Sequence, residues 1–239
     1  MKTTYHAAAS RGHADHGWLQ SHHTFSFADY FDPQRMGFGA LRVINDDRVA
    51  AGKGFGRHPH RDMEIISIPK SGSLRHEDSM GNIAIIAQND VQSMSAGSGV
   101  THSEMNDSAT DPVAFLQIWV HTRKPGIAPA YSQKTFDPAE RKNSWQLIVA
   151  PNTSEKDVVK IFQDAWFTRG DFTAGQTPTY ELMDTEKNGV YVFVISGRLR
   201  IGEHVLETGD GLGIEDVAQI DFVIVEDAEV LVMEVPMSG

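Results

Sequence analysis

The most informative segment of this chain reads Gly54-Phe55-Gly56-Arg57-His58-Pro59-His60-Arg61-Asp62-Met63-Glu64. Glycines open the segment and an apolar run at 63–68 follows it, which is the pattern of a turn beside a β-strand. His58 and His60 are two residues apart, and residues i and i+2 of an extended chain point to the same side. We therefore expect the two imidazoles to converge on one ion.

A second segment repeats this geometry, Gly97-Ser98-Gly99-Val100-Thr101-His102-Ser103-Glu104-Met105-Asn106. Its His102 and Glu104 are again two residues apart. Three imidazoles and one carboxylate suit a divalent first-row metal such as Fe, Mn, Ni, Cu or Zn. Four protein ligands leave positions open on an octahedral ion, which favours a catalytic site. A single His-x-His pair is equally compatible with surface or packing histidines, but two such pairs favour a metal.

Composition excludes several classes of protein. The chain has 239 residues, enough for one large or two small domains, and 40% hydrophobic residues, as in ordinary globular proteins. The formal net charge is −11, which argues against direct nucleic-acid binding. Cysteine is absent, so disulfides, thiolate metal sites and cysteine nucleophiles are excluded. We expect a cytoplasmic, monomeric protein without a signal peptide or a membrane span.

Short apolar runs broken by Gly, Asp, Asn and Pro predict an all-β chain. Short helical turns are expected at 27–31 and 138–142. The predicted strands are residues 40–44, 63–68, 83–87, 91–94, 113–121, 145–150, 165–169, 179–183, 190–195, 199–201, 211–214, 219–225 and 229–235.

A faint internal repeat indicates two related β-barrels. Ser71-Gly72-Ser73-Leu74-Arg75 reappears as Ser196-Gly197-Arg198-Leu199-Arg200. The polar, proline-containing stretch 124–143 is the expected join. The predicted organisation is therefore an N-terminal barrel at 1–123, a linker region at 124–143 and a C-terminal barrel at 144–239.

The two histidine segments also resemble a known superfamily. Gly-x5-His-x-His-x3-Glu, read from Gly52, resembles the first cupin motif, and Gly99-x2-His102-x3-Asn106 resembles the end of the second. Together with the motifs below, which lie within residues 11–119, the chain resembles the pirins, specifically the bacterial pirin-like proteins described as quercetin 2,3-dioxygenases. The further motifs are Arg11-Gly12-His13, His23-Thr24-Phe25-Ser26-Phe27, His76-x-Asp78-Ser79 and Gln117-Ile118-Trp119.

The resemblance implies a bicupin, with two tandem antiparallel jelly-roll barrels, few short helices and one mononuclear metal in the N-terminal barrel. Spacing alone leaves Glu64 open as a ligand, since it shares a face with His58 and His60 if the strand is unbroken. The resemblance implies the ligands His58, His60, His102 and Glu104, with Glu64 behind them. We expect Fe(II), with Cu, Ni, Mn, Co or Zn as alternatives. The repeat maps the four ligands onto Met183, Thr185, Phe222 and Ile224, so the C-terminal barrel is predicted to hold no metal.

Several other side chains are candidates for a substrate pocket. An aromatic substrate favours aromatic walls, and Phe25, Phe27, Phe55 and Trp119 are the candidates, with core packing as the alternative for each. Asn106 is expected to orient a nearby loop or ligand. His22 and His23 are candidates for the pocket mouth, whereas His76 with Asp78 is expected to fix a loop. Asp46 and Asp47 are predicted to form a hairpin turn.

The resemblance implies a metal-dependent dioxygenase that opens the ring of a flavonol such as quercetin with O2 and releases CO. Glu104 would take the proton of the flavonol 3-hydroxyl. The alternative is a non-enzymatic metal or redox sensor that binds a partner protein, as eukaryotic pirins are described. A third class is a cupin isomerase or hydrolase with a non-redox metal, which would not need O2.

Overall fold

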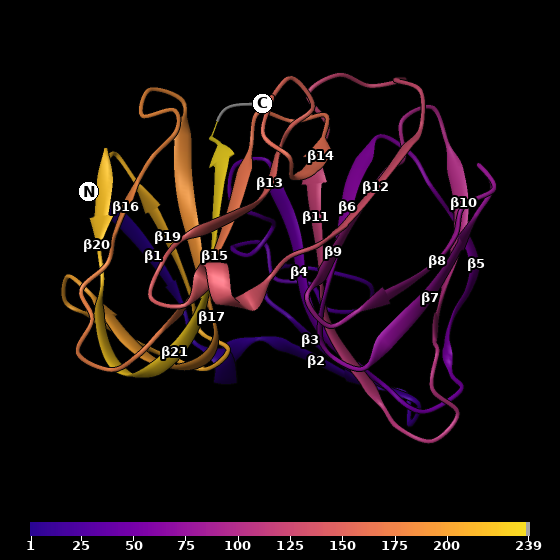
Figure 1. The fold of residues 1–239 in the computed structure, drawn as a ribbon, viewed down its shortest axis with the longest axis horizontal. Coiled ribbons are helices and arrows are strands. Elements are labelled where there is room, and N and C mark those ends of the chain that lie inside the picture. Colours follow the sequence, from indigo (N-terminus) through magenta and orange to yellow (C-terminus); the bar gives the residue numbers. More distant parts are fainter. Residues whose placement is uncertain (238–239) are drawn as a thin grey trace.

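The computed structural model describes residues 1–237, which form two β units side by side (Figure 1). The N-terminal unit is a sandwich of a seven-stranded and a four-stranded sheet. In spatial order, the larger sheet contains β12 (Ala130–Thr135), β9 (Asp90–Ser95), β6 (Met63–Ser71), β11 (Val113–His121), β4 (Leu41–Val49), β3 (Leu19–His23) and β2 (Gly12–Asp15). The smaller sheet contains β5 (Gly54–His60), β10 (Val100–Asn106), β7 (Ser73–Asp78) and β8 (Ile83–Ala87).

The C-terminal unit is built on an eight-stranded sheet. Two short 3-10 helices, η1 (Ala8–Ser10) and η2 (Pro138–Arg141), complete the regular structure of the described chain. The sheet contains β1 (Lys2–His6), β19 (Gly211–Glu215), β17 (Asn188–Ile201), β21 (Val223–Pro236), β15 (Trp166–Phe172), β13 (Gln146–Pro151), β14 (Val159–Ile161) and β18 (His204–Glu207), and a separate pair contains β16 (Thr179–Glu181) and β20 (Gln219–Asp221).

The all-β cupin prediction is confirmed, with sandwiches of open sheets in place of closed barrels. The crossing from β5 to β6 shows how the chain changes sheet. Asp62, between these strands, has a φ of 49°, a left-handed conformation that Asp tolerates better than most residues. This turn interrupts the extended segment, so Glu64 does not share a face with His58 and His60.

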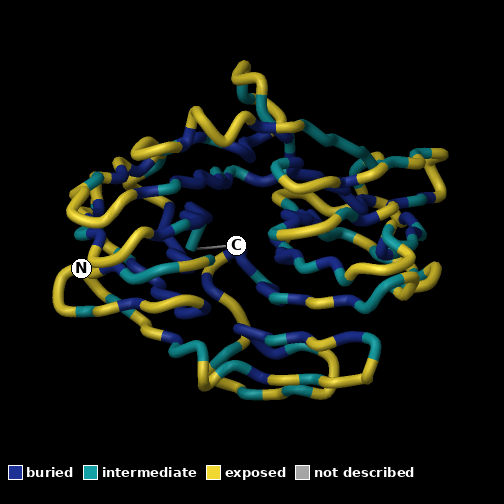
Figure 2. Tube along the Cα trace, turned by 60° about the horizontal axis from the view of Figure 1, so that its bottom comes forward, coloured by how far each residue is buried: buried dark blue, intermediate teal, exposed yellow. Residues whose placement is uncertain are grey.

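A hydrophobic core joins the two units. Ile66 and Ile118 of the N-terminal unit belong to the same buried cluster as Phe167, Tyr191 and Leu231 of the C-terminal unit. In Figure 2 long buried segments lie in the interior of the molecule, while many turns at its periphery are exposed. The sheets therefore pack on each other through alternate apolar side chains.

Two strands cross the predicted boundaries. β1 pairs with β19 of the C-terminal sheet, where Figure 1 shows it as an indigo strand among orange ones. β12 lies inside the predicted linker region and pairs with β9 of the N-terminal sheet. The division at 124–143 stays a prediction. No helix in residues 1–237 is long and apolar enough to cross a bilayer.

Candidate metal centre and pocket

Three histidines meet on two neighbouring strands of the smaller sheet. β5 and β10 are antiparallel, and His102 stands opposite His58. Their Nε2 atoms are 3.1 Å apart, and the ring of His60 lies 4.8 Å from that of His58 and 4.9 Å from that of His102. The three side chains can each offer one nitrogen to a common ion. The expected convergence of the imidazoles is thus present.

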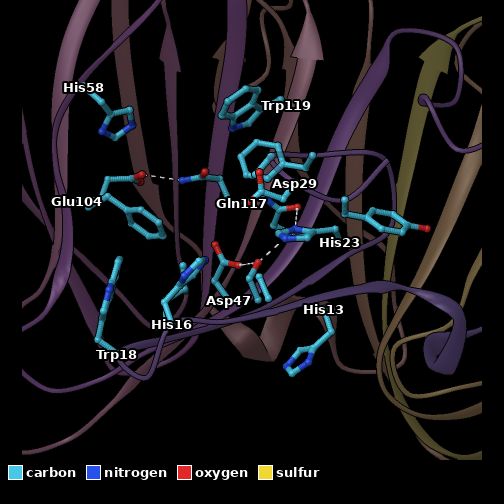
Figure 3. A pocket seen from close by; sticks show the side chains of 18 of the residues that line it. His13, His16, Trp18, His23, Asp29, Asp47, His58, Glu104, Gln117 and Trp119 are labelled. Carbon is cyan, nitrogen blue, oxygen red and sulfur yellow. Dashed lines mark hydrogen bonds between the residues drawn. The ribbon is translucent and has the colours of Figure 1, made fainter. Parts of the chain in front are cut away.

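Glu104 lies beside these histidines. The β5–β10 register shifts between His102 and Glu104, and the Glu104 carboxylate is buried between the two sheets. Its Oε1 accepts a hydrogen bond from Ser67 Oγ at 3.0 Å. Its Oε2 accepts one from Gln117 Nε2 at 2.6 Å (Figure 3). Glu104 forms a compact group of potential ligands with His102 and His76, and this group shares His102 with the group of three histidines. The larger sheet therefore holds the carboxylate against the histidines of the smaller one.

The environment keeps the imidazoles of His60 and His102 neutral. Burial, together with neighbouring His102 and His58, lowers the pKa of His60 to about 4. Burial and the same kind of repulsion lower the pKa of His102 to about 3. A neutral imidazole has a free lone pair, so both rings are ready to bind a cation near neutral pH. The structure thus contains a His/Glu cluster able to hold a metal.

His76 packs behind His102, with ring centroids 5.3 Å apart. Its Nε2 lies 3.1 Å from Asp78 Oδ2, and Asp78 also accepts hydrogen bonds from the amides of Met80 and Asn82. The predicted role of His76 and Asp78 in fixing a loop is confirmed by these bonds. The Nδ1 atoms of His76 and His102 are buried, and neither has a hydrogen-bond partner among the described residues.

A cavity of about 650 Å³ opens beside the cluster. Phe27, Phe55 and Trp119 line it together with His58, His60 and Glu104. Trp119 packs edge-on against His60 at 4.9 Å and against Phe27 at 5.3 Å. Aromatic walls thus begin at the histidines, which suits a flat aromatic ligand.

Phe25 does not line this cavity, so its predicted contact with substrate is wrong. Its ring is buried in the core that joins the two units, where it packs edge-on against Tyr191 at 5.5 Å. β3 ends at His23, and the strand alternation that turns His23 toward the pocket does not continue to Phe25.

The two residues expected behind the ligands hold other parts of the structure. Glu64 lies on the opposite face of β6 from Ser67, and its Oε2 accepts bonds from Ser95 Oγ and the Phe162 amide. Burial raises the pKa of Glu64, although these bonds oppose the shift. Asn106 donates to the carbonyls of Val49, Ala50 and Asp111, and so closes the loop after β10.

A polar wall of the cavity was not predicted. It contains Ser21, His23, Asn45, Asp47 and Gln117, of which only His23 had been a pocket candidate. Asp46 and Asp47 lie within β4, so the predicted hairpin turn is wrong. Aspartate favours turns in general, but here β11 and β3 pair with β4 on both sides and hold Asp46 and Asp47 in an extended strand. His22 lies outside the cavity and stacks on His13 at 4.8 Å.

Gln117 shows what signal could have identified part of this wall. It is two residues before Trp119 on β11, and both side chains line the cavity. Once Trp119 is taken as a pocket residue, strand alternation therefore predicts that Gln117 lies on the same face. In the C-terminal unit, the repeat-related Phe222 and Ile224 belong to a hydrophobic core and Met183 is exposed.

Comparison with known proteins agrees with this geometry. The family model "Pirin" matches residues 4–120, and a model described as "Quercetinase C-terminal cupin domain" matches residues 147–235. A quercetin 2,3-dioxygenase of Escherichia coli (strain K12) is 42% identical over 229 residues, 96% of each chain. A pirin-like protein of Caulobacter vibrioides is 39% identical and covers 93% of this chain and 95% of its own.

Solved structures share the whole fold. The crystal structure of YhhW from Escherichia coli has a TM-score of 0.92 at 40% identity and covers 98% of both chains. A second, of bacterial pirin YhhW from Escherichia coli in complex with nickel(II), has a TM-score of 0.91 at 39% identity, covering 98% of this chain and 99% of that one.

Proposed function

The chain belongs to the pirin family, and on that premise we propose that it is a metal-dependent dioxygenase that opens a flavonol ring with O2 and releases CO. The observation that supports this most directly is a pair of overlapping groups of potential ligands beside an aromatic-walled cavity. One group is His58, His60 and His102, and the other is His76, His102 and Glu104. In the proposed site His58, His60, His102 and Glu104 hold one metal ion.

The residues of the cluster fit such an ion. The lowered pKa values of His60 and His102 favour neutral nitrogen donors, and oxygen and imidazole donors suit divalent first-row metals. Fe(II) is the proposed ion, with Cu, Ni, Mn, Co or Zn as alternatives; the Escherichia coli relative was solved with nickel(II). When bound, the ion would supply Lewis acidity to the flavonol oxygen and redox chemistry toward O2.

Glu104 is the proposed base. The proton of the flavonol 3-hydroxyl passes to a Glu104 carboxylate oxygen, and the carboxylate becomes a carboxylic acid. Ser67 and Gln117 each donate to one of the two oxygens and leave lone pairs on both. These two donors fix the orientation of the carboxylate before the substrate arrives, so little reorganisation is needed.

Trp119, Phe27 and Phe55 would bind the flat rings and keep water from the reacting carbon atoms. Both atoms of O2 enter the product and one ring carbon leaves as CO, so the overall reaction needs no added reductant. The pocket walls therefore bind and orient the substrate, while the proton transfer is assigned to Glu104.

The test measures CO release from quercetin under O2 by protein that has been stripped of metal and reloaded with one ion at a time. We expect release with a redox-active metal, and loss of at least 100-fold of the rate in His58→Ala and Glu104→Gln. Matched controls are His204→Ala and Glu77→Gln, which lie outside the cavity and should retain the rate.

Absence of CO with every metal, despite stoichiometric metal binding, would contradict the dioxygenase function. Retention of activity in Glu104→Gln would contradict the role of Glu104 as the base. Redox-dependent binding of a partner protein without turnover would favour the sensor alternative.

A further inference from the structure

Four polar side chains form a continuous patch on the pocket face of β3 and β4. Ser21 stands opposite Asp47 and His23 stands opposite Asn45 in the antiparallel register. All four line the cavity, and none exposes more than 4% of its surface. We call this group of Ser21, His23, Asn45 and Asp47 the polar patch.

Hydrogen bonds connect the polar patch. Ser21 Oγ donates to Asp47 Oδ1 and lies 3.3 Å from His23 Nδ1, which is 2.8 Å from Asn45 Oδ1. The rings of Phe27 and Tyr30 pack on His23 at 5.3 and 6.4 Å. The patch is therefore held in one arrangement by bonds and by aromatic packing.

Asp47 keeps unused hydrogen-bonding capacity. Ser21 is its hydrogen-bond partner, through Oδ1, and no described residue bonds to Oδ2 or forms an ion pair with the carboxyl. Oδ2 is not among the fully buried atoms that lack a partner, and Asp47 lines the cavity, so a ligand or water in the cavity can complete the bonding of this oxygen. Burial also raises the pKa of Asp47 to about 7, so near neutrality the carboxyl can donate as well as accept.

Gln117 connects the polar patch with the metal cluster. Gln117, which bonds to Glu104, is the cross-strand neighbour of Asn45, and Asp47 is two residues further along β4. Two residues of a strand span about 7 Å, so Asp47 lies about that far beyond Asn45 along the cavity wall. Figure 3 shows Asp47 and His23 in a different part of the pocket from His58 and Glu104.

We propose that the polar patch, through Asp47, binds a hydroxyl group on a ring of the substrate that does not carry the reacting 3-hydroxyl. This inference rests on the proposed function and makes it more specific, because it selects polyhydroxylated flavonols. Asp47 binds the hydroxyl directly, Ser21 positions Asp47, and the aromatic walls contact the rings between the two polar ends.

The test measures binding to zinc-loaded protein in the absence of O2, so that turnover does not interfere. The probes are quercetin and 3-hydroxyflavone, which has the reacting hydroxyl and no other. Wild type should bind quercetin at least tenfold more tightly, and Asp47→Leu should reduce that ratio to within about threefold of one, since one good hydrogen bond is worth about a factor of ten. Asp47→Asn, whose amide both donates and accepts, should retain part of the preference.

Asp46→Asn is the matched control, because Asp46 lies on the other face of β4 and pairs with Lys70. Its ratio should equal that of wild type. If Asp47→Leu does not fold, Ser21→Ala tests the patch with a smaller change and should also lower the ratio. A wild-type ratio near one, or a full ratio in folded Asp47→Leu, overturns this inference and leaves the dioxygenase proposal standing. Failure of wild type to bind either probe contradicts both.

Discussion

Three buried carboxyls of the N-terminal unit differ in their hydrogen-bond partners. Glu104 accepts from two side chains of the larger sheet, Asp47 accepts from Ser21, and Glu64 accepts from the Phe162 amide. All three are buried, yet they lie in the cluster, the cavity wall and the junction respectively. Because all three carboxyls are buried, their different partners distinguish them better than their burial does.

Gln117→Leu removes one of the two donors to Glu104 while it roughly conserves volume. We expect metal affinity to fall about 10-fold or more, as for other partners that orient a metal ligand. Isothermal titration of stripped protein with the metal measures this. Gln20→Leu, an exposed position on β3, is the control and should bind as wild type does. Equal affinities in the two variants would rule out a role for Gln117.

Asp47 should make stability depend on pH. Because its pKa is about 7 in the folded protein and about 3.8 when unfolded, the folded state binds the proton more tightly. Its contribution to stability is therefore full below pH 4 and is lost as pH rises through 7. Urea unfolding at pH 5 and pH 8 should show wild type losing a few kcal/mol at most relative to Asp47→Asn. A constant difference between the two proteins would contradict the raised pKa.

Whole strands show what the sequence can predict here. Apolar strands such as β6, β11 and β21 lie where hydrophobic runs indicate them. The polar strands β2, β3 and β12 carry His, Gln, Ser and Lys in place of an apolar run, and no strand was predicted there. β3 alternates between buried and exposed positions, but its buried side chains include Ser21 and His23, which face the polar wall of the cavity.

Local sequence patterns also limit which residues of the site can be predicted. Two i, i+2 pairs predict the three histidines and Glu104 as ligands, because strand geometry alone brings such residues to one face. The partners Ser67 and Gln117 come from a different sheet, and the facing of two sheets is a tertiary property that local spacing does not contain. Asp47 was missed for a different reason: its local sequence favours a turn, so no strand was predicted there.

The turn between β9 and β10 should tolerate no side chain at Gly97. Its φ is 45°, and a Cβ there would lie 2.2 Å from the Ile127 carbonyl oxygen, so the backbone must move. We expect Gly97→Ala to cost about 2 kcal/mol or more in urea unfolding. Gly56→Ala, where a Cβ meets nothing within 4 Å, is the control and should cost much less. Similar losses in both variants would contradict this explanation.

At the scale of the whole molecule, the two units are joined by a shared core and by buried polar bonds. Glu64 of β6 bonds to the Phe162 amide, just after β14, and Ser93 of β9 donates to the Lys160 carbonyl. The metal cluster and the cavity belong to the N-terminal unit. They lie on the face of β6 that carries Ser67, opposite to the face that carries Glu64. The junction can therefore be weakened without a direct change to the cluster.

Glu64→Leu tests that separation. The Phe162 amide would lose its acceptor, which should lower the free energy of unfolding by about 1–3 kcal/mol. Metal stoichiometry and affinity should stay as in wild type, in contrast to Glu104→Gln. Thermal unfolding and metal titration on the same samples give both quantities. Loss of metal in folded Glu64→Leu would show that Glu64 belongs to the cluster after all.

The pairing of β1 with β19 also has a consequence for the order of events during translation. Tyr5 bonds to Asp210, 205 residues further along the chain. At about 5–20 residues per second, a ribosome needs roughly 10–40 s to synthesise that interval. Strands β5 and β10, which carry the cluster, can pair during this time. β1 has no partner until β19 has been synthesised. The pairing of β1 with β19 is thus among the last contacts that a nascent chain can form.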